Sequence, residues 1–453
     1  MSWHDAPHLE ELAAGVVRYA LERGASGAEC TINEGNEFSA TVRMGEVEQV
    51  KEAGSRGAGV RVLSGKRTGS SYTSDLTPEG LEAMVRQAVE LARITTEDPY
   101  AGLPDPAELG VHKAPLDLYF EDVAASDAAA RVEMARLAEK AALDFDPRVS
   151  NSEGGSFGAY TGASAFANSL GFSGSYRRSN CSLSVVPVVK DGDTMERDYW
   201  YSAARSVAKL EPPEYVGRKA AERALRRLNA RTITTRKAPV IFEPRVARTL
   251  LGHIFELVHG ESVYRKASLW AGKLGEKVAA GCVTVVDDST LPGLFGSAPF
   301  DDEGAPSRRN VIIDKGVLTS YLLNSYTARK LGMKSTGSAS RGLSGNAGIG
   351  HGNLFLESGS DAAQGILKKM GSGLLVTELM GHGFNGVTGD YSRGAAGLWV
   401  ENGEIAYAVS KVTIAGSIRD MLARVAALGD DLEFRGSVAA PTIAIEEMTI
   451  SGA

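Results

Sequence analysis

The spacing of hydrophobic residues predicts three helices in the N-terminal part of the chain. Residues 9–24 carry apolar side chains at helical intervals as far as Gly24, which is typical of a helix end. A second helix should begin with Thr77 as its N-cap and Pro78 at its first position, and run to about residue 94. A third should have Ser126 as its N-cap and run to about residue 145.

Short apolar runs between and after these helices predict paired strands. The runs 38–42 and 47–51 flank a turn that contains glycine, and so do the runs 57–63 and 68–73. Each pair should therefore form a hairpin. A second sheet region is expected over roughly residues 154–206.

The C-terminal half is richer in glycine and in strand patterns. We place a domain boundary within residues 231–238 and expect a strand at 239–242 that leads into a helix. Turn signals at 314–316 and 401–403 separate apolar stretches and predict further hairpins. Glycines punctuate residues 337–353, which indicates one flexible surface loop, either a lid or a disordered connector. Together these patterns predict an α+β protein of two domains, residues 1–230 and 231–453.

Composition limits the function classes that remain. With 453 residues, 43% hydrophobic and 23% charged, the chain is long enough for two or three cores and has the composition of a globular protein. The net charge of −7, without a basic block beside aromatic residues, argues against a nucleic-acid surface. No run reaches the ~18 apolar residues of a membrane span, and the first residues lack a signal-peptide pattern, so we expect a cytoplasmic protein. The cysteines Cys30, Cys181 and Cys282 include no C-x-x-C pair, which predicts buried or inert thiols in a reducing compartment.

Two charged runs are better explained by solvation than by chemistry. Residues 300–304 place three carboxylates in a row ahead of Arg308 and Arg309, a group that could bind a hard cation or act as acid and base. A solvated acidic turn that pairs with its own arginines is the favoured interpretation. The basic stretch 218–228 has the spacing of an amphipathic helix whose charged outer face we also expect to be solvated.

Three stretches carry a resemblance to a known family. Residues 250–266, 378–383 and 388–404 resemble the TldD/PmbA family, once called modulators of DNA gyrase. Within that family the chain is similar to the PmbA (TldE) branch. In looser form, the resemblance extends from about the first predicted helix to the last strand.

The resemblance implies a set of metal ligands that can be compared residue by residue. The active TldD branch binds zinc through a helix that reads H-E-x-x-x-H and a cysteine close to the C-terminus, with the glutamate as general base. If His259 matches the second histidine, Ile254 and Phe255 stand where the first histidine and the glutamate should be. If His253 matches the first histidine, Ile254 and Val258 take the other two places. Apolar side chains neither bind metal nor transfer protons.

The remaining polar residues make a poor set of zinc ligands. His253 and His259 lie six residues apart, so their side chains project ~120° apart on a regular helix, and Glu256 points in a third direction. No cysteine follows Cys282, so a C-terminal thiolate is missing as well. We therefore interpret both histidines as polar residues near the ends of a packed helix, with Glu256 as the remaining candidate for a catalytic base. The alternative is a three-histidine site that also uses His382.

The resemblance implies a PmbA/TldE-like, non-catalytic subunit of a TldD/TldE-type zinc metallopeptidase complex that acts on peptides or unfolded proteins. This chain would hold no cofactor, and the zinc would lie in a TldD-like partner. His382, Asp390 and Arg393 would contact the other subunit or the substrate. One alternative is a metallopeptidase in its own right that uses the helix within 250–266. The other is a homodimeric peptide-binding or regulatory protein.

Overall fold

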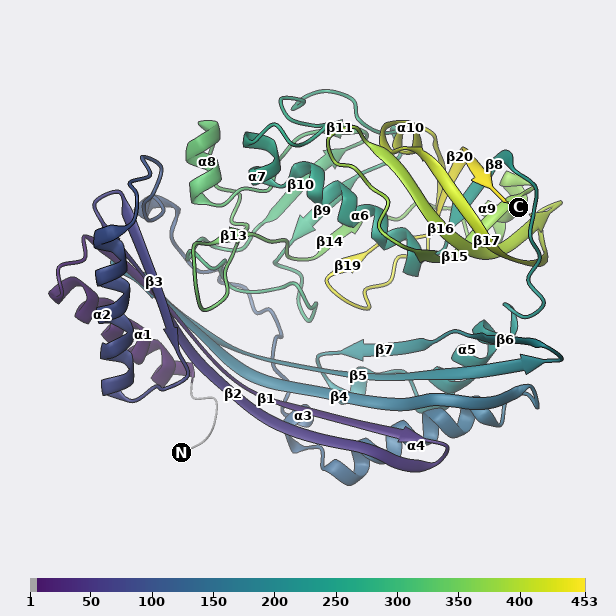
Figure 1. Cartoon of the computed structure of the whole chain (residues 1–453), viewed down its shortest axis with the longest axis horizontal. Helices are drawn as coiled ribbons and strands as arrows, with labels where there is room; N and C mark the ends of the chain where they lie inside the picture. The colour runs from purple at the N-terminus through teal and green to yellow at the C-terminus, as the bar shows by residue number, and fades with distance from the viewer. Residues whose placement is uncertain (1–5, 453) are drawn as a thin grey trace.

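A curved antiparallel sheet of long strands forms the N-terminal half of the molecule (Figure 1). The computed structural model describes residues 6–452. The strand order is β3-β2-β1-β4-β5-β6, and β7 also pairs with β5. The strands are β1 (Gly27–Arg43), β2 (Glu46–Ser64), β3 (Arg67–Thr73), β4 (Val149–Asn168), β5 (Ser173–Asp191), β6 (Thr194–Arg197) and β7 (Trp200–Ala204). Both predicted hairpins are confirmed, but they share one strand, because β2 pairs with β1 throughout and with β3 through residues 58–64.

Two groups of helices cover opposite ends of one face of this sheet (Figure 1). They are α1 (Ala6–Glu22) and α2 (Pro78–Ile94) in one group, and α3 (Glu121–Ala125), α4 (Ala128–Leu143) and α5 (Pro213–Leu225) in the other. Alternation along β1 decides which side chains they meet, since successive residues of a strand point to opposite faces. Cys30 and Ile32 pack with α1 and α2, and Phe38 and Ala40 pack with α4 and α5. Two single 3-10 turns, Pro106–Glu108 and Val207–Lys209, complete the elements of this half.

Of the two predicted N-caps, the structure has one at the expected residue and the other one residue later. Thr77 is the N-cap of α2 as predicted, because its hydroxyl accepts a hydrogen bond from the N–H of Gly80. The prediction that Ser126 caps the next long helix is wrong. Ser126 ends the short helix α3, and Asp127 caps α4 by accepting the N–H of Ala130. Both residue types are good N-caps, so sequence preference alone did not separate two adjacent candidates.

The C-terminal half is built on two larger sheets. Together with the N-terminal sheet and the helices, they make the fold α+β, as predicted. One sheet has the order β17-β16-β15-β8-β20-β18, with an additional β17–β20 pairing, and the other has the order β11-β10-β9-β14-β19. The first contains β8 (Arg236–Phe242), β15 (Gly373–Met380), β16 (Asp390–Glu401), β17 (Glu404–Ser417), β18 (Val425–Leu428) and β20 (Ile443–Ser451). The second contains β9 (Val285–Asp288), β10 (Arg309–Asp314), β11 (Val317–Leu318), β14 (Leu354–Leu356) and β19 (Val438–Ala439).

Helix α6 (Pro244–Val258) follows β8 and crosses the main core of this half. The fully buried side chains of Leu250, Leu251, Ile254 and Leu257 anchor it there. The remaining elements are α7 (Gly260–Tyr264), α8 (Ser325–Leu331), α9 (Ala363–Met370), α10 (Ile418–Ala423), β12 (Ala339–Ser340) and β13 (Gly348–Ile349). The predicted strand at 239–242 lies within β8.

Both predicted turns in this half are confirmed by their backbone conformation. Lys315 and Gly316 join β10 to β11, and Asn402 and Gly403 join β16 to β17. All four residues have positive φ angles, between 47° and 87°. Such angles are those of hairpin turns and favour glycine and asparagine.

The glycine-rich segment 337–353 packs against the N-terminal sheet rather than forming the flexible surface loop that was predicted. It contains β12 and β13, which pair with each other, and it lies against the N-terminal sheet. Arg341 forms an ion pair with Glu29 on β1, and both side chains are almost fully buried. A Cβ atom on Gly59 of β2 would lie only 1.7 Å from the carbonyl oxygen of Leu343. Glycine is therefore used here for close backbone approach.

The acidic run 300–304 is buried, so the prediction of a solvated turn is wrong. The carboxylate of Asp301 accepts the N–H groups of Glu303, Ala305 and Ala339. Glu303 accepts the N–H and the hydroxyl of Ser325. Burial raises the pKa of Asp301 to about 7, against the opposing effect of these donors. Backbone and hydroxyl donors take the place of water around these two carboxylates.

Candidate functional site

The first candidate ligand, His253, packs into an aromatic cluster formed with the loop before β16. Its ring lies 4.3 Å from the ring of Phe384 and 5.8 Å from that of Tyr391. Burial and, to a lesser extent, the Arg393 guanidinium lower the pKa of His253 to about 4. The imidazole is therefore neutral at pH 7. Its Nε2 atom is buried without a hydrogen-bond partner among residues 6–452.

The second candidate ligand, His259, lies just beyond the end of α6 and contacts a different set of side chains. Its ring stands 5.4 Å from the ring of Phe255, and the ring of His351 stands 5.1 Å from the same phenyl group. Burial lowers the pKa of His259 as well. Phe255 is thus an aromatic ring packed between the two imidazoles, and Ile254 beside it is only 2% exposed.

Glu256 is exposed on a third side of α6. It lies beside the loop before β16, where a Cβ atom on Gly386 would come within 2.8 Å of its Oε1 atom. Within residues 6–452, no three His, Cys, Asp or Glu side chains gather so that they could hold a metal ion. The donors on α6 therefore do not fit a zinc site.

The thiols and the predicted contact residues are spread over separate places. Cys30 and Cys181 are buried, in line with the prediction of buried or inert thiols, and Cys282 is exposed. The structure brings Arg393 to His253 and Tyr391, and the charge of Arg393 partly offsets the rise in the pKa of Tyr391 that burial causes.

Asp390 and His382 do not join that cluster. Asp390 accepts a hydrogen bond of 2.6 Å from the hydroxyl of Thr388, and His382 is exposed in the same loop. Of the three predicted contact residues, these two are therefore the more accessible.

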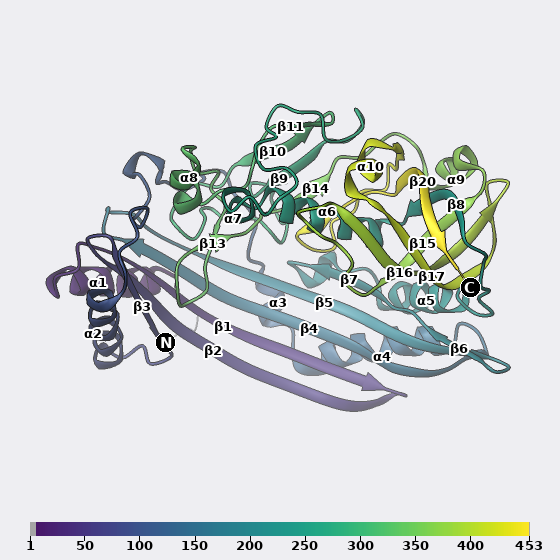
Figure 2. The same cartoon turned by 45° about the horizontal axis from the view of Figure 1, so that its top comes forward.

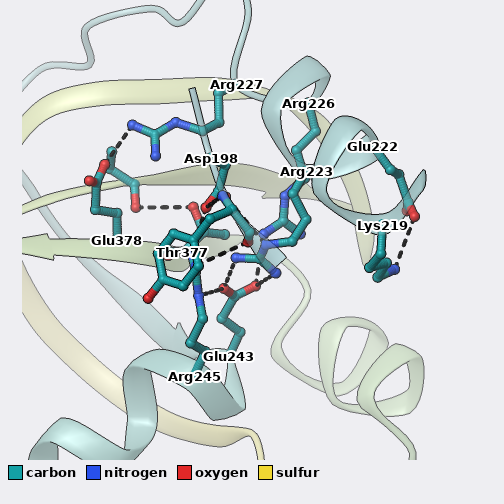
Figure 3. Close-up of polar contacts among 12 residues, drawn as sticks. Asp198, Lys219, Glu222, Arg223, Arg226, Arg227, Glu243, Arg245, Thr377 and Glu378 are labelled. Atoms are coloured by element: carbon teal, nitrogen blue, oxygen red, sulfur yellow. Dashed lines mark hydrogen bonds and ion pairs between the residues drawn. The ribbon is translucent and has the colours of Figure 1, made fainter. Parts of the chain in front are cut away.

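A buried ion-pair network at the start of α6 was not predicted (Figure 3). Arg223 of α5 binds Glu243, the residue before α6, at 2.5 Å, and also lies 3.3 Å from Asp198. Arg245 of α6 completes the network with a 2.9 Å contact to Asp198. The network joins α5, in the N-terminal half, to the start of α6.

Two neighbouring arginines extend this junction. Arg226 lies 2.9 Å from Glu243, and Arg227 lies 2.5 Å from Glu378, which belongs to the second family-like stretch (Figure 3). The expectation that the basic stretch 218–228 presents only a solvated charged face is therefore wrong. The run of arginines was a visible signal, but their carboxylate partners are distant in sequence and follow no pattern.

Comparisons with known proteins agree with this architecture. Residues 28–92, 121–228 and 235–452 match, in turn, domain 1, the central domain and the C-terminal domain of the PmbA/TldA metallopeptidases. The chain is 40% identical to the metalloprotease PmbA of Escherichia coli O157:H7, with 98% of this chain and 96% of that protein covered. It is 37% identical, with the same coverage, to a metalloprotease PmbA homolog of Haemophilus influenzae. The chain belongs to the PmbA/TldD metallopeptidase family.

Solved structures show the same fold over nearly the whole chain. A putative modulator of DNA gyrase from Bacteroides thetaiotaomicron is 27% identical with a TM-score of 0.91, and the alignment covers 98% of this chain and 99% of that one. TldE from Thermococcus kodakarensis is 23% identical with a TM-score of 0.87, covering 97% and 100%, and shows the fold alone. No helix within residues 6–452 has the length and apolar character needed to cross a membrane.

Proposed function

We propose that this chain is the non-catalytic, PmbA/TldE-like subunit of a cytoplasmic TldD/TldE-type zinc peptidase that acts on peptides or unfolded proteins. The observation that carries the proposal is that Ile254 and Phe255 are packed apolar side chains on α6. If His259 matches the second histidine of the family's motif, they stand where a histidine and a glutamate are expected. A TldD-like partner would supply both the zinc and the general base. In this chain, α6 serves as a structural element of the core.

Residues near the loop before β16 are the candidates for contact with the partner or the substrate. His382 and Asp390 are exposed there, and Arg393 is partly buried beside His253. Because Arg393 lies beside His253, a partner bound at this loop would lie close to α6. This arrangement supports a role in shaping the substrate site rather than in bond cleavage.

The first expected result is that the purified chain holds no stoichiometric zinc, because its candidate ligands point to separate clusters. Elemental analysis after gentle purification measures the zinc content. The His253→Ala and His259→Ala variants serve as controls and should leave that content unchanged. About one tightly held zinc per chain that is lost in either variant would contradict the proposal, since such stoichiometry requires a complete ligand set.

The second expected result is that Glu256→Gln leaves the peptidase activity of the assembled complex within several-fold of the parent complex. Removing a general base usually costs about 10² to 10⁴-fold, whereas Glu256 is exposed and its carboxylate lies beside Gly386. The matched control is Glu222→Gln, an exposed glutamate on α5. A loss of the larger size, in a variant whose thermal unfolding is unchanged, would make Glu256 a catalytic residue.

A further inference from the structure

A cavity of about 500 Å³ lies against the face of the N-terminal sheet that carries no helices. Its lining includes Glu37, Lys51, Tyr160, Arg178, Arg205 and Phe295. The strand register places Glu37, Tyr160 and Asn180 side by side on β1, β4 and β5. Because Phe38 and Ala40 point to the helices, Glu37 and Ser39 point to the opposite face. Figure 2 shows these strands running beneath the C-terminal half of the chain.

The floor of the cavity is built from an aromatic ring lying on two glycines. A Cβ atom on Gly35 would lie 2.6 Å from the ring of Tyr160, and one on Gly162 would lie 2.3 Å from its hydroxyl oxygen. Neither glycine has a positive φ angle, so the backbone conformation does not require glycine at these positions. Glycine is needed because a larger side chain would collide with Tyr160. The guanidinium of Arg178 stands 5.5 Å from the centre of the Tyr160 ring. The ring is thus held flat on the sheet before any ligand arrives.

The lining carries excess positive charge in a chain whose net charge is −7. Arg205 is 4% exposed and donates only to the carbonyl oxygens of Leu118, Ser179, Leu294 and Phe295. Burial and the nearby Arg178 lower the pKa of Arg205 to about 10, so it is still charged at pH 7. Within residues 6–452, neither Lys51 nor Arg178 forms an ion pair, and Glu37 is the one carboxylate in the lining.

We propose that this cavity binds a carboxylate of an extended peptide, with the carboxylate facing Arg178 and Lys51 and the peptide backbone lying over Tyr160. This inference rests on the proposed function, since it names the substrate class of the complex. Arg178 and Lys51 are both exposed, so their charges are accessible to an anionic ligand. Arginine also binds carboxylates through two parallel hydrogen bonds. The volume lies within the usual range of about 300–1,000 Å³ for ligand pockets.

A peptide fits this lining better than a nucleic acid. A nucleic acid carries regularly spaced phosphates and needs an extended basic surface. Here Glu37 lies beside the cations, and the strand opposite Lys51 contributes the uncharged Ser39. A single carboxylate flanked by neutral peptide backbone can pair with the cations and avoid repulsion from the carboxylate of Glu37.

The test is equilibrium binding to this chain alone, measured by fluorescence anisotropy with a neutral dye. One peptide is capped at both ends and contains two aspartates, and its analogue contains asparagines in their place. A third peptide is the asparagine analogue with a free C-terminal carboxylate. We expect one or both carboxylate-bearing peptides to bind about tenfold or more tightly than the capped asparagine peptide, as for a charged hydrogen bond. Which peptide binds identifies a side-chain or a terminal carboxylate.

The variants assign the effect to the cavity. Arg178→Gln and Lys51→Gln should each remove most of the preference for carboxylate, whereas Lys190→Gln, an exposed lysine on the same strand β5, should leave it intact. Equal binding of all three peptides, equal effects of Arg178→Gln and Lys190→Gln, or tighter binding of an oligonucleotide of the same charge would overturn the proposal. Because no partner and no hydrolysis are involved, this result is independent of whether the chain serves as a non-catalytic subunit.

Discussion

Hydrolysis of an unstructured peptide is expected only when this chain is mixed with a TldD-like partner that carries H-E-x-x-x-H. The physical reason is that Ile254 and Phe255, packed on α6, have apolar side chains that can neither bind zinc nor accept a proton. Each chain alone and the mixture would be assayed on the same peptide. General acid–base catalysis contributes about 10² to 10⁴-fold, so the difference between this chain alone and the mixture should be at least that large.

The contact between the two chains can be tested in the same assay. Arg393→Glu should lower the activity of the mixture without changing the zinc content of the partner, because Arg393 lies beside the loop that we propose as the contact. The control is Arg18→Glu, at an exposed position on α1. It makes the same change of charge at a site distant in sequence from Arg393 and should not change the activity of the mixture. Thermal unfolding of each variant separates a lost contact from a lost fold. If either chain alone cleaves at the rate of the mixture, the idea of an obligatory non-catalytic subunit is wrong.

Replacing Glu243 with alanine should lower the free energy of unfolding by about 3–5 kcal/mol, the usual cost of breaking a buried ion pair. Glu243 is 9% exposed, and its carboxylate contacts both Arg223 and Arg226. Without Glu243, Asp198 is the one carboxylate that remains near the buried Arg223 among the ion pairs of residues 6–452. Urea unfolding at pH 7 measures the change. The control is Glu222→Ala, whose exposed pair with Lys219 should contribute less than about 1 kcal/mol.

The contacts of Glu243 with Arg223 and Arg226 also predict how the stability of the protein depends on pH. Burial alone would raise the pKa of Glu243, but Arg223 and Arg226 outweigh it and hold the pKa below the ordinary value of 4.5. The stabilisation from this group is therefore fully present above that value and is lost as the pH falls through the lowered pKa of the folded state. The difference between wild type and Glu243→Ala should be constant near neutral pH and shrink in acid. A difference that grows in acid would contradict this assignment.

Local features of this protein follow from the sequence because short-range geometry decides them. The apolar spacing of residues 9–24 and the turns at 314–316 and 401–403 depend on neighbours a few positions away. The absence of an H-E-x-x-x-H pattern is also visible in the chain, and Ile254 and Phe255 have no donor atoms whatever the fold around them.

The tertiary structure alone decided which charged residues are buried and what they contact. Asp301 and Glu303 look solvated in the sequence, but backbone N–H groups and Ser325 supply the hydrogen bonds that water would otherwise provide. Arg341, within a glycine-rich segment, pairs with Glu29 on strand β1 of the N-terminal sheet. Arg223 likewise meets Glu243 only because α5 packs beside the start of α6. Burying a charge is costly unless a partner is near. Arg223 lies 20 residues from Glu243 and Arg341 lies 312 residues from Glu29, beyond the reach of any local pattern.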